Sequence, residues 1–411
     1  MITVQMKKLY SKICSLFDLK GFLIGCGIVA LTIALYLGGF IGQKSANTFS
    51  AALERADTCL GKGDDTVCAV TVARDLVSLK SGSEIMDAFA ERLNPGQCHY
   101  AGHFVGKELY KKYGNIEEAI AVCNRSCDSS CVHGIIGEAF ATGLGYDDPD
   151  FDLKHLSTEE IRIVGGPLCK VATNCHGVGH ALFQAYLQLE PSLEMCREIV
   201  GQPLKFNCYQ GAVMEYADIL SERNMRSISG LTYPTPESLS AFCDLPLFEE
   251  RRACFRYFTR VAEETLKKEG VSRSDAIKRV RDICAAQKTW DDKMACVAGV
   301  GVYSAYWIRR DQTVARRFCG QFVAAEDRAA CYLGQVSVAT QDRLDTLPGY
   351  CKSQTEERFR ESCYQTMFFF LLRLGTPVEE VRAICAQEDK ACTQAFEHRE
   401  RDPWREIARI F

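Results

Sequence analysis

The sequence lacks the signatures of several common enzyme classes. It contains no glycine-rich phosphate loop, no Gly-x-Ser-x-Gly nucleophile motif and no protein-kinase signature. It has no Cys-x-x-Cys pair, which argues against a thiol oxidoreductase, and no Cys-x-x-Cys-His motif for covalent haem. A net charge of −4 is too small to indicate a nucleic-acid partner. These absences leave metal binding, protein binding and structural roles to consider.

Patterns typical of β-strands are also scarce. Apolar residues recur instead at intervals of three and four, as in Phe255, Phe258, Val261 and Ala262, which is the period of an amphipathic helix. Residues 49–60 and 67–79 are expected to form the first two helices of the array, joined by a short polar turn. At 411 residues the chain can bury a substantial core. We therefore predict an all-α protein.

The N-terminal segment predicts a membrane anchor. Residues 21–42 contain no charged side chain and are long enough to cross a bilayer as a helix. Four lysines precede them, so the positive-inside rule keeps residues 1–20 in the cytoplasm and puts the rest in the periplasm or outside the cell. A cleaved signal peptide is the alternative, because small residues around Ser45 and Ala46 would permit cleavage. The uncleaved anchor is the preferred interpretation.

Cysteine is the unusual component, with 22 residues in the chain. Proteins of the reducing cytosol rarely keep so many unless their thiolates bind metal. Cys14 and Cys26 fall in the cytoplasmic or membrane segment, and the twenty that remain are an even number. This count fits a domain outside the cytoplasm in which every cysteine is disulfide-bonded.

The spacing of these cysteines predicts helical hairpins with a disulfide at each turn. From Cys196 onward a helix ends near one cysteine and the next helix begins with another, and the pairs recur every 32 to 47 residues. In the N-terminal part Cys123 is expected to bond to Cys131 by analogy with Cys196 and Cys208, which leaves Cys98 for Cys127. The expected bonds are Cys59–Cys68, Cys98–Cys127, Cys123–Cys131, Cys169–Cys175, Cys196–Cys208, Cys243–Cys254, Cys284–Cys296, Cys319–Cys331, Cys351–Cys363 and Cys385–Cys392.

The hairpin repeats over residues 190–400 resemble the Sel1-like and tetratricopeptide class, in particular its secreted cysteine-rich members. In those proteins a disulfide braces each pair of helices. The resemblance implies an α-solenoid-like scaffold that binds proteins or peptides. It implies no catalytic residues.

A duplicated motif carries five of the seven histidines. Cys98-His99-Tyr100-Ala101-Gly102-His103 returns 77 residues later as Cys175-His176-Gly177-Val178-Gly179-His180. Each copy is followed by a second motif, Cys131-Val132-His133-Gly134 and Cys208-Tyr209-Gln210-Gly211, and then by Glu138 and Glu215. The cysteine-to-cysteine spacing is 33 residues and the histidine-to-glutamate spacing 39 in both copies. Two matched spacings indicate an internal duplication.

The duplicated histidines predict a metal site. Side chains four residues apart share one face of a helix, so each His-x-x-x-His pair could chelate one ion. The glycines beside them would let the two helices pack closely about a pseudo-twofold axis. The candidate ligands are His99, His103, His133, Glu138, His176, His180 and Glu215. They could hold zinc, iron, manganese or copper, with one glutamate instead orienting a ligating imidazole.

Two other roles for the histidines stay open. A non-covalent haem with two axial histidines is a less favoured cofactor. Duplication also copies residues with purely structural roles, so histidines that bond only to backbone groups are the alternative to a metal site. The zinc-protease mechanism is not supported, because it needs a glutamate directly after the first histidine, where this chain has Tyr100 and Gly177.

The sequence thus predicts five regions: a cytoplasmic segment (1–20), an anchor (21–42), a connector with the first hairpin (43–95), the duplicated Cys/His domain (96–229) and helical-hairpin repeats (238–411). The preferred function is a membrane-anchored scaffold or binding protein with a metal site and a protein or peptide partner. The alternative is a metalloenzyme, a hydrolase or oxidoreductase, with its centre at the duplicated histidines.

Overall fold

The computed structural model describes residues 48–61, 66–93, 95–145, 157–201, 204–221, 231, 233–305, 308, 311–341, 346–373, 376–387 and 390–403. All regular elements in these ranges are helices, as predicted. The predicted anchor at residues 21–42 lies outside the described residues, and none of the described helices is both long and apolar enough to span a bilayer.

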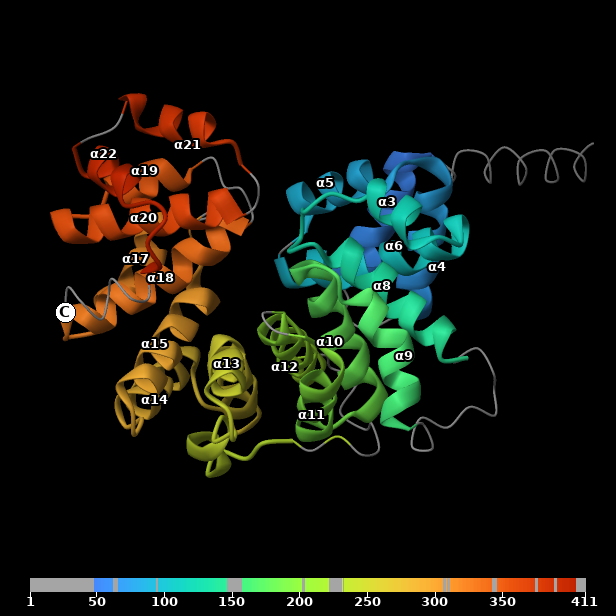
Figure 1. The fold of residues 1–411 in the computed structure, drawn as a ribbon, viewed down its shortest axis with the longest axis horizontal. Coiled ribbons are helices and arrows are strands. Elements are labelled where there is room, and N and C mark those ends of the chain that lie inside the picture. Colours follow the sequence, from blue (N-terminus) through green and yellow to red (C-terminus); the bar gives the residue numbers. More distant parts are fainter. Residues whose placement is uncertain are drawn as a thin grey trace, which may run out of the picture.

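Ten of the described helices form one continuous stack, in which each packs mainly against the one before and the one after. The stack consists of α4 (Thr66–Leu79), α6 (Pro95–Tyr113), α8 (Ser130–Gly143), α10 (Ala172–Tyr186), α12 (Lys205–Ser221), α13 (Phe248–Lys268), α15 (Trp290–Ser304), α18 (Ala325–Gln341), α20 (Glu357–Arg373) and α22 (Lys390–Glu397). It curves into an arch with α4 near one end and α22 near the other (Figure 1). Contacts made mainly between neighbours are typical of a helical repeat protein.

The other described helices come before or between the members of the stack along the chain. They are α3 (Phe49–Gly61), α5 (Gly82–Arg92), α7 (Ile116–Ala121), α9 (Thr158–Leu168), α11 (Leu189–Ile199), η3 (Ser238–Ala241), α14 (Arg273–Ala285), α17 (Gln312–Gly320), α19 (Leu347–Lys352), α21 (Val378–Ile384) and η4 (Cys385–Gln387). Their starts follow local sequence rules, since Ser81 with Glu84 and Ser157 with Glu160 form capping boxes.

Disulfides close the turns between these elements. The structure pairs twenty cysteines with the partners expected from the sequence. Nine of the bonds join the end of one helix, or the residues just after it, to the first turns of the next. Their partners are only 6 to 12 positions apart, so each bond closes a short loop.

Glycines set the separation of three helix pairs. A Cβ added at Gly106 would lie 2.1 Å from the Cys131 carbonyl oxygen, and one at Gly134 would lie 2.1 Å from that of His103. The same reciprocal contact joins α10 to α12 and α15 to α18. There the glycines and the carbonyls they meet are Gly179 with Cys208, Gly211 with His176, Gly301 with Cys331, and Gly334 with Ala298. Only glycine allows two helix backbones to come this close.

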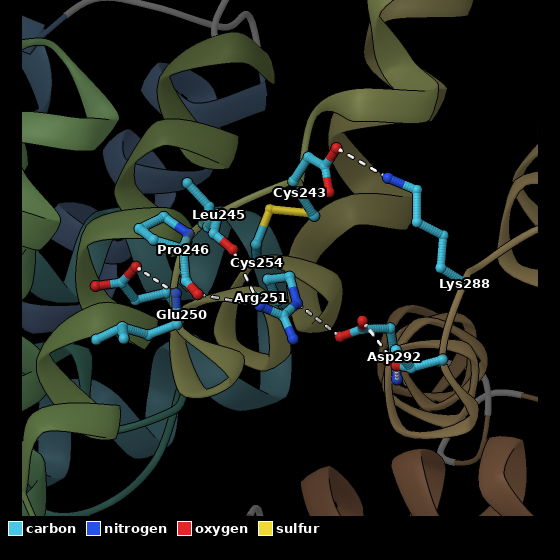
Figure 2. A network of polar contacts seen from close by, with 11 residues as sticks. Cys243, Leu245, Pro246, Glu250, Arg251, Cys254, Lys288 and Asp292 are labelled. Carbon is cyan, nitrogen blue, oxygen red and sulfur yellow. Dashed lines mark hydrogen bonds and ion pairs between the residues drawn. A yellow bond between two sulfur atoms is a disulfide. The ribbon is translucent and has the colours of Figure 1, made fainter.

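Ion pairs link successive repeats in the C-terminal part of the stack. Arg251, three positions before Cys254, donates from Nε to Oδ1 of Asp292 at 2.8 Å (Figure 2). Its Nη1 also donates to the carbonyl oxygens of Leu245 and Pro246 at 3.1 and 3.3 Å, in the turn that the disulfide closes (Figure 2). The Arg251 guanidinium therefore connects the turn before its own helix to the next helix of the stack.

The same device returns in the following repeats. Lys293, three positions before Cys296, pairs with Asp327 at 2.7 Å. Arg328, three positions before Cys331, lies 3.5 Å from Glu356 and donates to carbonyl oxygens of the turn before its own helix. The acids Asp292 and Asp327 each stand four positions before a cysteine. We call this series, Arg251–Asp292, Lys293–Asp327 and Arg328–Glu356, the ion-pair ladder.

Candidate metal centre

Three consecutive helices of the stack bring five histidines together. His99 and His103 lie on α6, His133 on α8, and His176 and His180 on α10. Ring centroids of His99 and His103 are 4.6 Å apart, and the His180 ring lies 5.0 Å from His103 and 5.2 Å from His133. The convergence follows from the spacing of four within each helix and from the close helix packing that the glycines allow.

Four of these histidines have the geometry of a ligand set. One ring nitrogen from each of His99, His103, His133 and His180 lies within 4.8 Å of the other three. His99, His133 and His180 are buried, with at most 5% of their surface exposed. This is the spacing from which four imidazoles could close on one ion.

Each of the five rings has a buried nitrogen without a hydrogen-bond partner among the described residues. Buried ring nitrogens without a hydrogen bond in the described part of the chain include Nε2 of His99, His103, His176 and His180, and Nδ1 of His133. Leaving a buried polar atom unpaired costs about 1–3 kcal/mol. Five such atoms gathered in one place therefore call for a physical explanation, and a metal ion is one that would satisfy several of them at once.

Outer contacts orient two of the rings. Nδ1 of His99 lies 3.1 Å from the Cys127 carbonyl oxygen, and Nδ1 of His180 lies 2.6 Å from Oε2 of Glu215. Because both partners are acceptors, each Nδ1 must carry the hydrogen, which leaves the lone pair on Nε2. Gln184 donates from Nε2 to Oε1 of Glu215 at 2.8 Å and holds the carboxylate in place. A carbonyl or carboxylate behind the imidazole is typical of metal-ligating histidines.

The electrostatics favour neutral rings. Burial lowers the pKa of His99, and it lowers the pKa of His103, His133 and His176 well below the usual value, with the neighbouring imidazoles adding to the effect. Burial raises the pKa of Glu215, but the hydrogen bonds from His180 and Gln184 outweigh it, so the pKa lies below its ordinary value. Burial therefore favours the neutral, metal-binding form of His99, His103, His133 and His176, and one buried carboxylate lies behind the site.

The acidic side chain of Asp218 lies near the centre and pairs with the basic side chain of Arg260. Oδ2 of Asp218 on α12 lies 3.9 Å from Nε2 of His99. Its other oxygen is paired with the Arg260 guanidinium of α13. Neither Asp218 nor Gln184 was predicted from the motifs, although the spacing carries a signal: Asp218 is three residues after Glu215, and Gln184 is four after His180.

The structure separates the predicted ligands into three groups. His99, His103, His133 and His180 form the four-nitrogen set, and His176 lies beside it with its ring centroid 4.6 Å from that of His133. Glu215 acts behind His180 rather than in the set. Glu138 is not part of the centre, because its carboxylate lies 3.3 Å from the Lys111 ammonium.

The two copies of the motif are not equivalent in space. Gly134 meets the carbonyl of His103, whereas Gly211 meets that of His176, so His103 corresponds structurally to His176 and Lys107 to His180. The expected match of His99 with His176 is wrong by one helical turn. The connectors explain the offset, since α7 has 6 residues and α11 has 11. The equal spacings of the motifs therefore do not describe a pseudo-twofold centre.

The packing of the histidine rings also argues against a non-covalent haem. A haem has to lie flat between two axial imidazoles, but here the rings contact each other directly, with centroids 4.6 to 5.9 Å apart. This arrangement leaves no slot for a porphyrin. Comparison with protein-family models, with curated proteins and with solved structures finds no significant match to this chain.

Proposed function

We propose that this protein is an extracytoplasmic helical-repeat scaffold whose N-terminal helices are fastened by a zinc ion bound to His99, His103, His133 and His180. The observation that supports it best is the set of four ring nitrogens within 4.8 Å of one another. A site with four protein ligands and no open position is typical of structural zinc. Such an ion would cross-link α6, α8 and α10.

The ligand types favour zinc over the other candidates. Imidazole nitrogen suits zinc, copper and iron, whereas manganese prefers carboxylate oxygens. The only carboxylates predicted as ligands are Glu138, which pairs with Lys111, and Glu215, which hydrogen-bonds to His180. Copper and iron remain the alternatives to be compared with zinc in the test below.

The remaining parts of the proposal concern location and partners. Ten disulfides are suited to an oxidising compartment, which is where the predicted anchor at residues 21–42 would place the domain. The curved stack of α13 to α22 offers a long surface of the kind that repeat proteins use to bind peptides or proteins. We propose such a partner for this region.

A metalloenzyme is the second candidate, because of His176. This fifth ring lies beside the set, 4.6 Å from His133 and 4.9 Å from His180, and its buried Nε2 has no hydrogen-bond partner. It could act as a base or as an exchangeable ligand next to a metal-bound substrate. In that case His176→Ala would abolish an activity while the metal stayed bound, whereas the scaffold predicts no activity to lose.

The test is the metal content of the full chain, purified without a histidine tag and dialysed against a weak chelator. We expect about one equivalent of zinc per chain, measured by inductively coupled plasma mass spectrometry. His180→Ala should lose the metal, and His398→Ala, whose side chain is part of a surface pair with Glu361, should keep it. A wild-type chain that retains no metal, or equal zinc in both variants, would refute the proposal.

A further inference from the structure

Among the ten disulfides in the described part of the chain, one differs from the other nine. Cys98–Cys127 spans 29 positions, whereas the others span 6 to 12. It joins the first turn of α6 to the segment that precedes α8, and the second copy of the motif has no counterpart, because Cys175 bonds to the nearby Cys169. The exceptional bond is therefore found only next to the histidine centre.

This bond lies next to one candidate metal ligand and just before the helix that carries another. Cys98 directly precedes His99 in the chain, and the Cys127 carbonyl oxygen accepts the hydrogen bond from Nδ1 of that histidine at 3.1 Å. Two residues after Cys127, Ser129 is the N-cap residue of α8, the helix that carries His133. The position of the Cys127 backbone thus sets the orientation of one ligand and the start of the helix that presents another.

The segment between the bond and α8 has an unfavourable backbone. Cys127, Asp128 and Ser129 have φ values of 55°, 56° and 57°, in the left-handed region. Only one other non-glycine residue in the described ranges, Leu187, has a positive φ. Crowding at Cβ disfavours this conformation for every residue except glycine, so a run of three persists only while the surroundings hold it.

The rest of the connector is held independently of this bond. The Ser83 backbone nitrogen donates to the Val122 carbonyl oxygen at 2.7 Å, and Asn124 and Ser126 both donate to Oδ1 of Asp87, at 2.6 and 2.9 Å. On the other side, the disulfide between Cys123 and Cys131 anchors the start of α8. Opening Cys98–Cys127 would therefore remove the covalent link that holds residues 127–129 and leave them backbone hydrogen bonds such as that from Ser129 to Arg125, while the surrounding fold stays in place.

We propose that the Cys98–Cys127 disulfide positions His99 and His133 for the metal, and that its reduction by a dithiol weakens metal binding. This inference rests on the proposed metal site. With the bond open, residues 127–129 can relax to right-handed backbone, the Cys127 carbonyl moves away from His99, and α8 can start differently. Loss of such an outer contact lowers metal affinity by about 10–100-fold in comparable sites.

The reduction is an ordinary thiol–disulfide exchange. Cys127 is partly exposed and Cys98 is 2% exposed, so a thiolate of the dithiol attacks the Cys127 sulfur and Cys98 leaves as a thiolate that takes up a proton. The second thiol of the reagent then displaces Cys127 from the mixed disulfide. Two electrons pass to the protein, which gains two thiols, and the dithiol becomes a disulfide.

The test compares two double variants of the full chain, Cys98→Ser/Cys127→Ser and Cys351→Ser/Cys363→Ser. The second pair is the control, because it bonds in the C-terminal stack, far along the chain from the histidines. Zn²⁺ affinity is measured by competition with a chromophoric chelator, and folding by circular dichroism. We expect Zn²⁺ to bind about 10–100-fold more weakly to the first variant and unchanged to the control.

Equal Zn²⁺ affinity in the wild type and the Cys98/Cys127 variant would overturn the inference and leave the proposed metal site intact. A wild-type chain that binds no Zn²⁺ would remove both. If the Cys98/Cys127 variant does not fold, the wild-type chain is titrated with a phosphine reductant, which reduces disulfides but binds Zn²⁺ more weakly than a dithiol does, and its disulfides are mapped by mass spectrometry. Zn²⁺ release that accompanies reduction of Cys98–Cys127 supports the inference, and Zn²⁺ retained after that reduction refutes it.

Discussion

The helix pairs α10/α12 and α15/α18 are packed alike but carry different side chains. In both, a glycine of the first helix meets a cysteine carbonyl of the second, and a glycine of the second meets a carbonyl of the first. Where α10 has His176 and His180, however, α15 has Ala298 and Val302 in the corresponding positions. The backbone contact is therefore a repeated structural unit, and the histidines are an addition to it.

The polar contacts between helices also differ between the C-terminal and the N-terminal part of the stack. The ion-pair ladder joins α13, α15, α18 and the segment before α20. In the N-terminal part the helices that carry the histidines meet through their rings and glycines, and α6 and α8 also share the Lys111–Glu138 ion pair. With the proposed zinc ion bound, the N-terminal helices would gain a cross-link in addition to their protein contacts, and the ion-pair ladder would be independent of it.

The largest expected effect comes from the glycines that both pairs share. A Cβ at Gly211 or Gly334 would lie 1.9 or 2.0 Å from a carbonyl oxygen of the facing helix. Gly211→Ala and Gly334→Ala should each lower the free energy of unfolding by about 3 kcal/mol, because the helices must move apart. Urea unfolding measures this loss.

Only Gly211→Ala should also reduce Zn²⁺ affinity, because the helix pair α10/α12 carries groups of the centre, whereas α15/α18 carries none of them. Gly349→Ala is the control, because an added Cβ there has no atom within 4 Å. It should leave stability unchanged or slightly higher. If Gly211→Ala and Gly334→Ala affected Zn²⁺ binding equally, the division between framework and metal site would be wrong.

The next largest effect concerns Glu138 and Glu215, which occupy equivalent positions in the two copies of the motif. Glu215→Gln should weaken Zn²⁺ binding by about 10–100-fold, because the amide no longer provides the charge that polarises His180. Glu138→Gln should leave Zn²⁺ affinity unchanged, because that carboxylate faces Lys111. Calorimetric titration of both variants with Zn²⁺ measures the difference, and equal losses would restore the symmetric centre that the motif spacing suggests.

The smallest effect tests the ion-pair ladder. The Asp292 and Arg251 side chains are only 9% and 22% exposed, so Asp292→Asn should lower the free energy of unfolding by about 1–2 kcal/mol. Asp244→Asn is the control, since Asp244 and its partner Lys288 are 65% and 86% exposed and 3.7 Å apart, and it should cost close to nothing. Neither change should alter Zn²⁺ affinity, and a loss of metal in Asp292→Asn would contradict the separation of the two regions.

Local spacing made much of this structure predictable. Cysteines 6 to 12 positions apart on either side of a turn can reach each other wherever the hairpin sits, and the pairing follows. The helical period likewise puts His99 and His103 on one face. The sequence contains a signal for the ion-pair ladder, because Asp292-Lys293 and Asp327-Arg328 stand at the same distance before a cysteine. Charged residues are also common at helix starts for other reasons, so this signal does not by itself predict the pairs.

The amino-acid order therefore determined the helices, the disulfides at their turns and the two histidine pairs, since each depends on residues within one or two turns of one another. The tertiary structure decided which side chains share the centre. In the structure the first histidine pair is offset by one helical turn relative to the second. Glu215 hydrogen-bonds to His180, whereas Glu138 pairs with Lys111. The physical reason is that helix contacts are set by where backbones can approach, and a connector longer by one turn shifts every side chain beyond it without changing a motif.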